Sequence, residues 1–159
     1  MHLMCKEKKI LILGVGEAQL HLINEARNLG YYIVVCDMRS ESEGAKIADK
    51  FYCVNYVNRE AVLEIASNEQ IDGVISNSEP AMLTVAYVAE ELGLVGNSVK
   101  SVETLLSKTK FRELQKKAGV YAPVHYMVSS EMELLEKVQN MRYPLIIQPI
   151  ESSGTRGTT

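Results

Sequence analysis

Short apolar runs alternate with amphipathic stretches along the first 95 residues of the chain. The apolar runs predict strands at Lys9–Leu13, Tyr31–Cys36, Phe51–Val54, Gly73–Ser76 and, more briefly, Leu94–Val95. Between them, apolar residues at helical spacing predict helices over about 17–29, 58–68 and 82–92. Strands that alternate with helices are typical of right-handed crossovers in a parallel sheet. Residues 1–96 are therefore expected to form an open, doubly wound parallel α/β domain.

The pattern changes after residue 96. Two short consecutive helices are predicted at 98–106 and 107–118, so that 97–119 is a helical connector. The remainder, 120–159, predicts the beginning of a small α+β unit with an extended segment, a helix, a strand and a loop, at Pro123–Val128, 130–140, Pro144–Ile150 and 151–159. Because a two-stranded sheet is marginal alone, we expect the whole chain to be a fragment of a larger protein.

Composition narrows the classes of function. The 159 residues carry a net charge of −3, without the basic excess that nucleic acids or anionic membranes attract, and no apolar run is long enough to cross a bilayer. The three cysteines, Cys5, Cys36 and Cys53, are scattered, which favours reduced thiols and a cytoplasmic location. The histidines share no metal-ligand spacing, so no metal site is predicted in this chain.

The turn after the first strand is the first candidate site. Gly14 and Gly16 precede a predicted helix, and Asp37 closes the second strand, which is close to a dinucleotide-binding fingerprint. However, Gln19 stands at the third glycine, and Glu17 would repel a pyrophosphate but suit an amine or a hydroxyl. Three interpretations stay open: an NAD site, a turn that faces another ligand, and a tight turn with only a structural role.

Two further segments carry candidate chemistry. Ser76–Pro80 follows the fourth strand, so that Glu79 could contact a ligand beside the opening turn. Alternatively, Glu79 could only stabilise the helix that it begins, through the helix dipole. The loop Ser152, Ser153, Gly154, Thr155, Arg156, Gly157 offers small residues and donors for an anion, but could equally be a terminal loop that binds no ligand. It is not a Walker A loop.

Taken in order, these segments resemble the N-terminal half of ATP-grasp ligases, in the branch similar to carbamoyl-phosphate synthase large subunits and biotin carboxylases. The resemblance rests on stretches spread over nearly the whole chain, namely 10–16, 44–51, 71–75, 92–97, 108–120 and 143–157. It implies a Rossmann-like pre-ATP-grasp domain, a connector and the start of the small ATP-binding lobe. Such enzymes use ATP to convert a small-molecule carboxylate into an acyl phosphate, which an amine, ammonia or a thiol then attacks.

The resemblance also assigns residues. It implies ATP contacts for Lys108, for Gln148 and for the loop of Ser152, Ser153, Gly154, Thr155, Arg156 and Gly157, and a substrate site at Gly16, Glu17, Asp37 and Glu79. Gln148 stands where the family usually has a lysine, so weaker ATP binding is expected. Ligands for Mg²⁺ are expected beyond Thr159, and the chain alone is therefore expected to be inactive. The resemblance is also compatible with a homodimer.

Two alternatives to an ATP-dependent ligase remain. An NAD-dependent Rossmann protein would explain Gly14, Gly16 and Asp37, but leaves Lys108 and the terminal loop without a task. A non-catalytic nucleotide- or metabolite-binding module is the second, because Gln148 brings no charge to the phosphates.

Overall fold

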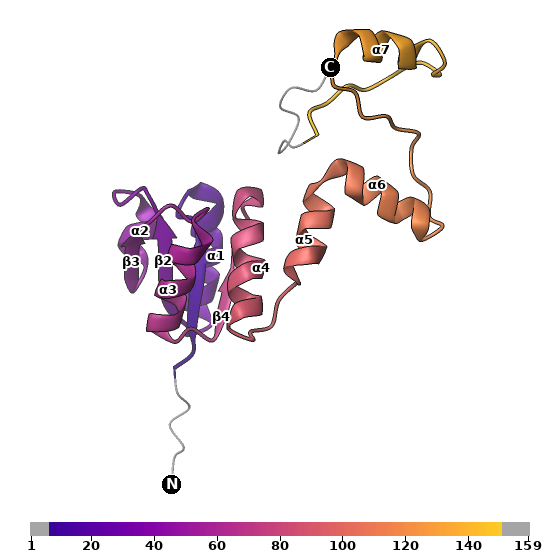
Figure 1. Ribbon diagram of the computed structural model, residues 1–159. Coiled ribbons are helices and arrows are strands. Elements are labelled where there is room, and N and C mark those ends of the chain that lie inside the picture. Colours follow the sequence, from indigo (N-terminus) through magenta and orange to yellow (C-terminus); the bar gives the residue numbers. More distant parts are fainter. Residues whose placement is uncertain (1–6, 151–159) are drawn as a thin grey trace. The chain divides into compact units, whose positions relative to one another are not determined.

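The computed structural model describes residues 7–150 (Figure 1). The chain divides into two compact units, Met1–Val102 and Glu103–Thr159, which we call the first and the second unit. The division falls within one helix, α5 (Val99–Leu106). The finer boundaries expected from the sequence, at residues 96 and 119, stay predictions.

The first unit is built on a four-stranded parallel sheet. Its strands are β1 (Lys9–Leu13), β2 (Tyr32–Asp37), β3 (Lys50–Cys53) and β4 (Gly73–Ile75), in the spatial order β3-β2-β1-β4. Central β1 pairs with β2 and β4, with Leu11 opposite both Val34 and Val74. The predicted parallel α/β fold is confirmed, and all four of these strands lie within a residue or two of their predicted ranges.

Helices cover both faces of this sheet, as Figure 1 shows. They are α1 (Glu17–Asn28), α2 (Glu43–Ile47), α3 (Arg59–Glu69), the short 3₁₀ helix η1 (Glu79–Ala81) and α4 (Met82–Glu91). Alternate residues of one strand point to opposite faces. Thus Ile12 packs in a core with Ile23 of α1, whereas Leu11 packs in a second core with Val62 of α3 and Val88 of α4. The unit is therefore doubly wound, as predicted.

One predicted strand of the first unit is wrong, and one helix was missed. Leu94–Val95 is not a strand, because the Leu94 N–H donates to the Ala89 carbonyl at 2.8 Å and so closes the end of α4. The Val95 side chain is fully exposed. The missed helix is α2, whose five residues are too few to show a helical pattern. Ser42 caps it by accepting from the Ala45 N–H at 3.3 Å.

Left-handed residues end the longer helices. Gly30, Gly93 and Gly119 follow α1, α4 and α6 (Lys108–Lys117) with positive φ, and Gln70 does the same after α3 with φ of 53°. A side chain makes this conformation unfavourable, whereas glycine adopts it readily.

We expect Gln70→Gly to raise the free energy of unfolding by about 0.5–1 kcal/mol, because relief of the left-handed strain exceeds the extra entropy of glycine in the unfolded chain. Urea unfolding followed by circular dichroism would measure this change. Gln70→Ala is the control, since it keeps a Cβ atom and should bring no gain. An equal gain in both variants would contradict the explanation.

The second unit contains α6 and α7 (Glu131–Val138). Ser130 caps α7 by accepting from the Glu133 N–H at 3.2 Å, and the Glu133 side chain accepts in turn from the Ser129 N–H at 2.9 Å. The strand predicted at Pro144–Ile150 and the extended segment Pro123–Val128 form no strand in the described part of this unit. The physical reason is that neither segment has a hydrogen-bonded neighbour there, and a strand requires one.

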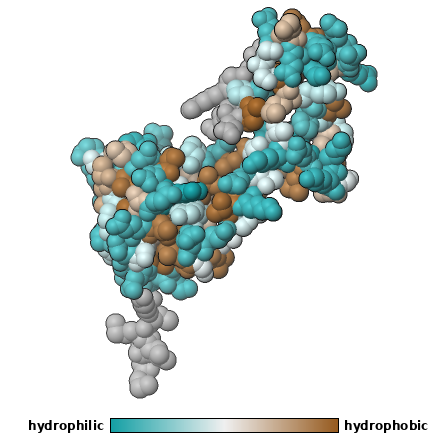
Figure 2. Space-filling model, in the orientation of Figure 1, coloured by the Kyte–Doolittle hydropathy of each residue, from teal (hydrophilic) through white to brown (hydrophobic). Residues whose placement is uncertain are grey.

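Apolar side chains of the second unit are largely exposed. Tyr121, Val124, Met132 and Ile146 are all more than 70% exposed, and no residue of α6 or α7 is buried. Figure 2 shows apolar residues (brown) lying among polar ones (teal) on the visible face. Within residues 7–150, no helix combines the length and the apolar character needed to span a membrane.

Candidate active site at the opening turn

The turn from β1 into α1, Gly14–Gly16, uses its backbone N–H groups within the protein. Gly14 N donates to the Cys36 carbonyl at 3.0 Å, and Val15 N donates to Asp37 Oδ2 at 3.1 Å. Gly16 N donates to Gln19 Oε1 at 3.2 Å. Gly14 has φ of +100°, which a residue with a side chain rarely adopts. The turn is therefore preformed, and each of its three donors already has an acceptor.

Asp37, at the end of β2, is only 3% exposed and is saturated with hydrogen bonds. Oδ1 accepts from Arg39 N and Nε, both at 3.0 Å, while Oδ2 accepts from Val15 N at 3.1 Å and Arg39 Nη2 at 2.7 Å. Burial of the carboxyl opposes ionisation, but the hydrogen bonds from the Arg39 side chain and from the backbones of Arg39 and Val15 outweigh it. They lower the pKa of Asp37 below its usual value.

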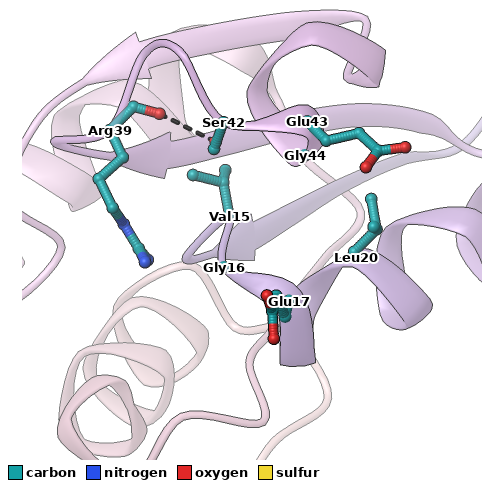
Figure 3. Close-up of a pocket in the computed structure, with 8 residues that line it drawn as sticks. All are labelled: Val15, Gly16, Glu17, Leu20, Arg39, Ser42, Glu43 and Gly44. Carbon is teal, nitrogen blue, oxygen red and sulfur yellow. Dashed lines mark hydrogen bonds between the residues drawn. The ribbon is translucent and has the colours of Figure 1, made fainter.

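A groove of about 330 Å³ lies beside this turn, and we call it the opening-turn groove. It is formed by the turn, by the start of α1 and by the loop from β2 into α2, and its lining residues are Val15, Gly16, Glu17, Leu20, Arg39, Ser42, Glu43 and Gly44. Figure 3 shows the Arg39 side chain reaching from the loop toward Gly16, with Glu43 and Leu20 at the opposite end. Because Arg39 is already paired with Asp37, the two carboxylates of Glu17 and Glu43 give the lining an acidic balance.

Close approach explains both glycines of the groove. A Cβ atom on Gly16 would lie 3.1 Å from Arg39 Nη1, and one on Gly44 would lie 2.9 Å from the Val15 carbonyl oxygen. The second contact involves backbone that cannot move aside easily. The groove thus depends on glycine at position 44, which lets the first turn of α2 lie against the opening turn.

The segment after β4 is tied to the opening turn by side chains. Ser76 Oγ donates to the Leu13 carbonyl at 2.7 Å, and Gln19 Nε2 donates to Asn77 Oδ1 at 2.6 Å. Glu79 is exposed at the first residue of η1 and does not line the groove. The turn after β1 and the segment after β4 thus lie side by side, as the sequence predicts. The groove, however, is lined by the segment after β2 and not by the segment after β4.

Of the predicted substrate residues, the groove brings together Gly16 and Glu17, while Asp37 lies beneath it as the partner of Arg39. Sequence reasoning missed Arg39, Ser42, Glu43 and Gly44. A signal was available for Arg39, since a basic residue two positions after a strand-ending aspartate can pair with it. The ligand contacts of all four predicted residues stay predictions.

The residues predicted to bind ATP lie in the second unit. Lys108 is the first residue of α6, directly after the Ser107 cap, and Gln148 is exposed in the segment that follows α7. The loop Ser152–Gly157 lies outside the described residues. Among residues 7–150, no three acidic, histidine or cysteine side chains gather as metal ligands.

The fold has counterparts among known proteins. Residues 23–96 match the model of the ATP-grasp N-terminal domain. This stretch is similar to an ATP-grasp N-terminal domain. It begins within α1, runs past the end of α4 and includes Arg39, Glu43 and Gly44 of the groove, whereas the opening turn lies before it. The resemblance expected from the sequence to the N-terminal portion of ATP-grasp ligases is therefore confirmed.

Similar proteins extend the match over nearly the whole chain. The formate-dependent phosphoribosylglycinamide formyltransferases of Bacteroides fragilis and Wolinella succinogenes are 26% and 28% identical over 94% of this chain, but only 39% of each relative is covered. The chain thus spans about two fifths of the length of these curated relatives.

Solved ATP-grasp structures share the fold. The phosphoribosylglycinamide synthetase of Anaerococcus prevotii superposes with a TM-score of 0.74 at 26% identity, covering 89% of this chain and 36% of the synthetase. The biotin carboxylase domain of Hydrogenobacter thermophilus 2-oxoglutarate carboxylase, solved with magnesium ADP and bicarbonate, has a TM-score of 0.79 at 22% identity, covering 96% and 37%. At the lower identity the likeness concerns the fold alone.

Proposed function

We propose that the whole protein to which these residues belong is an ATP-dependent ligase that activates a small carboxylate as an acyl phosphate. The observation that carries this proposal is the alignment of 94% of the chain with formate-dependent phosphoribosylglycinamide formyltransferases. The match of residues 23–96 with the ATP-grasp N-terminal domain supports the same class. The more specific likeness to carbamoyl-phosphate synthase stays a prediction, and we propose the cytoplasm as the site of action.

The proposed reaction has two steps. A carboxylate oxygen attacks the γ-phosphorus of ATP, the bond to the β-phosphate oxygen breaks, and ADP leaves. An amine nitrogen then attacks the acyl carbon, loses a proton and expels phosphate. Since anions approach each other in the first step, cations and backbone donors must neutralise charge. We assign this task to Lys108, to Arg156 and to the loop Ser152–Gly157, with Gln148 as a neutral donor and with Mg²⁺ held by residues outside this chain.

The opening-turn groove is the proposed place for the other substrate. Its acidic lining by Glu17 and Glu43 suits an amine or a hydroxyl group better than a polyanion. The names of the relatives point to formate and phosphoribosylglycinamide as the first substrates to try, and the acidic lining suits the amine of the latter, not its phosphate. We also propose a homodimer, in which the exposed apolar side chains of the second unit pack against those of a second copy of the protein.

The geometry of the turn disfavours the NAD alternative. A dinucleotide site needs free backbone donors for the pyrophosphate and a free carboxylate for the ribose hydroxyl groups. Here the donors of Gly14, Val15 and Gly16 have partners within the protein, and Asp37 already accepts four hydrogen bonds.

Trapping of the acyl phosphate with hydroxylamine tests the proposal. The whole protein, given ATP, Mg²⁺ and a panel of small carboxylates that includes formate, is expected to release ADP and form a hydroxamate with one of them. The 159-residue chain alone is expected to form none, because it is expected to lack the metal ligands. Hydroxamate formed by the short chain, or no ADP release by the whole protein with any carboxylate, would contradict the proposal.

A further inference from the structure

Gln19 stands where a dinucleotide-binding turn has its third glycine, and the proposed ligase reaction gives it no task. It is a polar residue of the first turn of α1, yet it is only 7% exposed. Buried polar side chains are costly unless they make specific hydrogen bonds. Gln19 is therefore expected to make specific hydrogen bonds inside the turn.

The Gln19 side chain fills the space beside both glycines of the turn. A Cβ atom built on Gly14 would lie 3.1 Å from Gln19 Cγ, and one built on Gly16 would lie 3.1 Å from Gln19 Oε1. In a dinucleotide-binding turn the second glycine, here Gly16, lets the backbone approach the pyrophosphate at the N-terminus of the helix, and the third lets the helix pack closely on the strand. Gln19 therefore fills the space beside Gly16 through which a phosphate group would approach the backbone.

Gln19 also takes the donor that such a phosphate would use. Its Oε1 accepts from the Gly16 N–H at 3.2 Å, as a phosphate oxygen would. The amide is held in this orientation from its other end, where Nε2 donates to Asn77 Oδ1 at 2.6 Å. Asn77 is fixed in turn, because its Nδ2 donates to the Ala18 carbonyl at 2.7 Å. The oxygen of Gln19 is thus directed at the turn by a chain of three hydrogen bonds.

We propose that Gln19 is a specificity-determining residue that excludes phosphate groups from the opening turn. Its side chain replaces a bound phosphate in both volume and hydrogen bonding, so that the turn cannot compete for nucleotides. The proposal goes beyond the ligase function and does not rest on it, since every contact lies within the first unit and concerns no ATP residue.

Amide resonances of the 159-residue chain would test this proposal directly. In nitrogen–proton correlation spectra, inorganic pyrophosphate and, separately, NAD are titrated against the wild type, Gln19→Gly and Gln19→Glu. We expect Gln19→Gly to bind pyrophosphate at least about tenfold more tightly than the wild type, the effect of regaining one hydrogen bond to a charged group. Shifts should centre on the amides of residues 14–17.

Gln19→Glu is the matched control, because it keeps the acceptor for Gly16 and adds a negative charge, and it should bind no better than the wild type. If Gln19→Gly loses its dispersed spectrum, Gln19→Ala takes its place, since it too frees the Gly16 donor. Equal affinities in the wild type and the glycine or alanine variant would overturn the proposal. So would shifts at residues 14–17 of the wild type at the same concentrations.

Discussion

Replacing Asp37 by alanine is expected to lower the free energy of unfolding of the first unit by about 3 kcal/mol, the upper end for hydrogen bonds to a charged group whose loss leaves buried donors unsatisfied. The carboxylate is 3% exposed and joins β2 to the opening turn through the Val15 N–H. Its loss leaves that buried donor and the Arg39 N–H without an acceptor. Urea unfolding followed by circular dichroism would measure the change.

Arg39→Ala is the matched control for this prediction. The Arg39 side chain is 58% exposed, so its removal costs only the pairing with Asp37, which we expect to be worth at most about 1 kcal/mol at such an exposed position. Equal losses in the two variants would mean that the ion pair, and not the bond to the turn, is what stabilises this site.

The same contacts make the stability of the wild type depend on pH. Because the pKa of Asp37 is lowered in the folded protein, its contribution is fully present above about pH 4, the ordinary value for the unfolded chain, and is lost as the pH falls through the folded pKa. The Asp37→Ala variant should therefore lose less stability than the wild type between about pH 5 and pH 2.

Replacing Lys108 by methionine is expected to weaken ATP binding to the whole protein at least about tenfold, because a hydrogen bond between an ammonium group and a phosphate contributes about 1.5–3 kcal/mol. Lys108 is the first residue of α6, and methionine keeps most of its length without the charge. Titration calorimetry with ATP and Mg²⁺ would measure the affinity.

Two further variants test whether the effect on ATP affinity is specific to Lys108 and depends on charge. Lys110→Met changes another lysine of α6 that we assign no role, and it should leave the affinity within about twofold of the wild type, as expected for a surface charge. Gln148→Lys should tighten ATP binding several-fold, since a charged donor replaces a neutral one. Equal losses at positions 108 and 110 would show that Lys108 acts only through the general charge of the helix.

Most of the first unit could be predicted from its sequence, because its elements are long enough to show their period. The alternation of buried strands with amphipathic helices located β1 to β4, and Gly30 and Gly93 indicated where α1 and α4 end. The failures have local causes. Leu94 closes the end of α4 with its N–H, and no neighbouring strand accompanies Pro144–Ile150 within the described residues.

The candidate site was only partly predictable. The glycines of the opening turn and Asp37 could be found because they follow strands at a recognisable spacing. Which of their polar groups face a ligand could not, since that depends on contacts between distant segments. Arg39 turns back to saturate Asp37, and Gln19 turns back to the Gly16 N–H, so the turn that resembles a dinucleotide site lacks free donors.

Parallel titrations of the whole protein with ATP–Mg²⁺ and with NAD test the central claim most directly. The account predicts saturable heat with ATP–Mg²⁺, reduced by Lys108→Met, and no binding of NAD at the opening turn. Saturable binding of NAD together with the absence of ATP binding would contradict it.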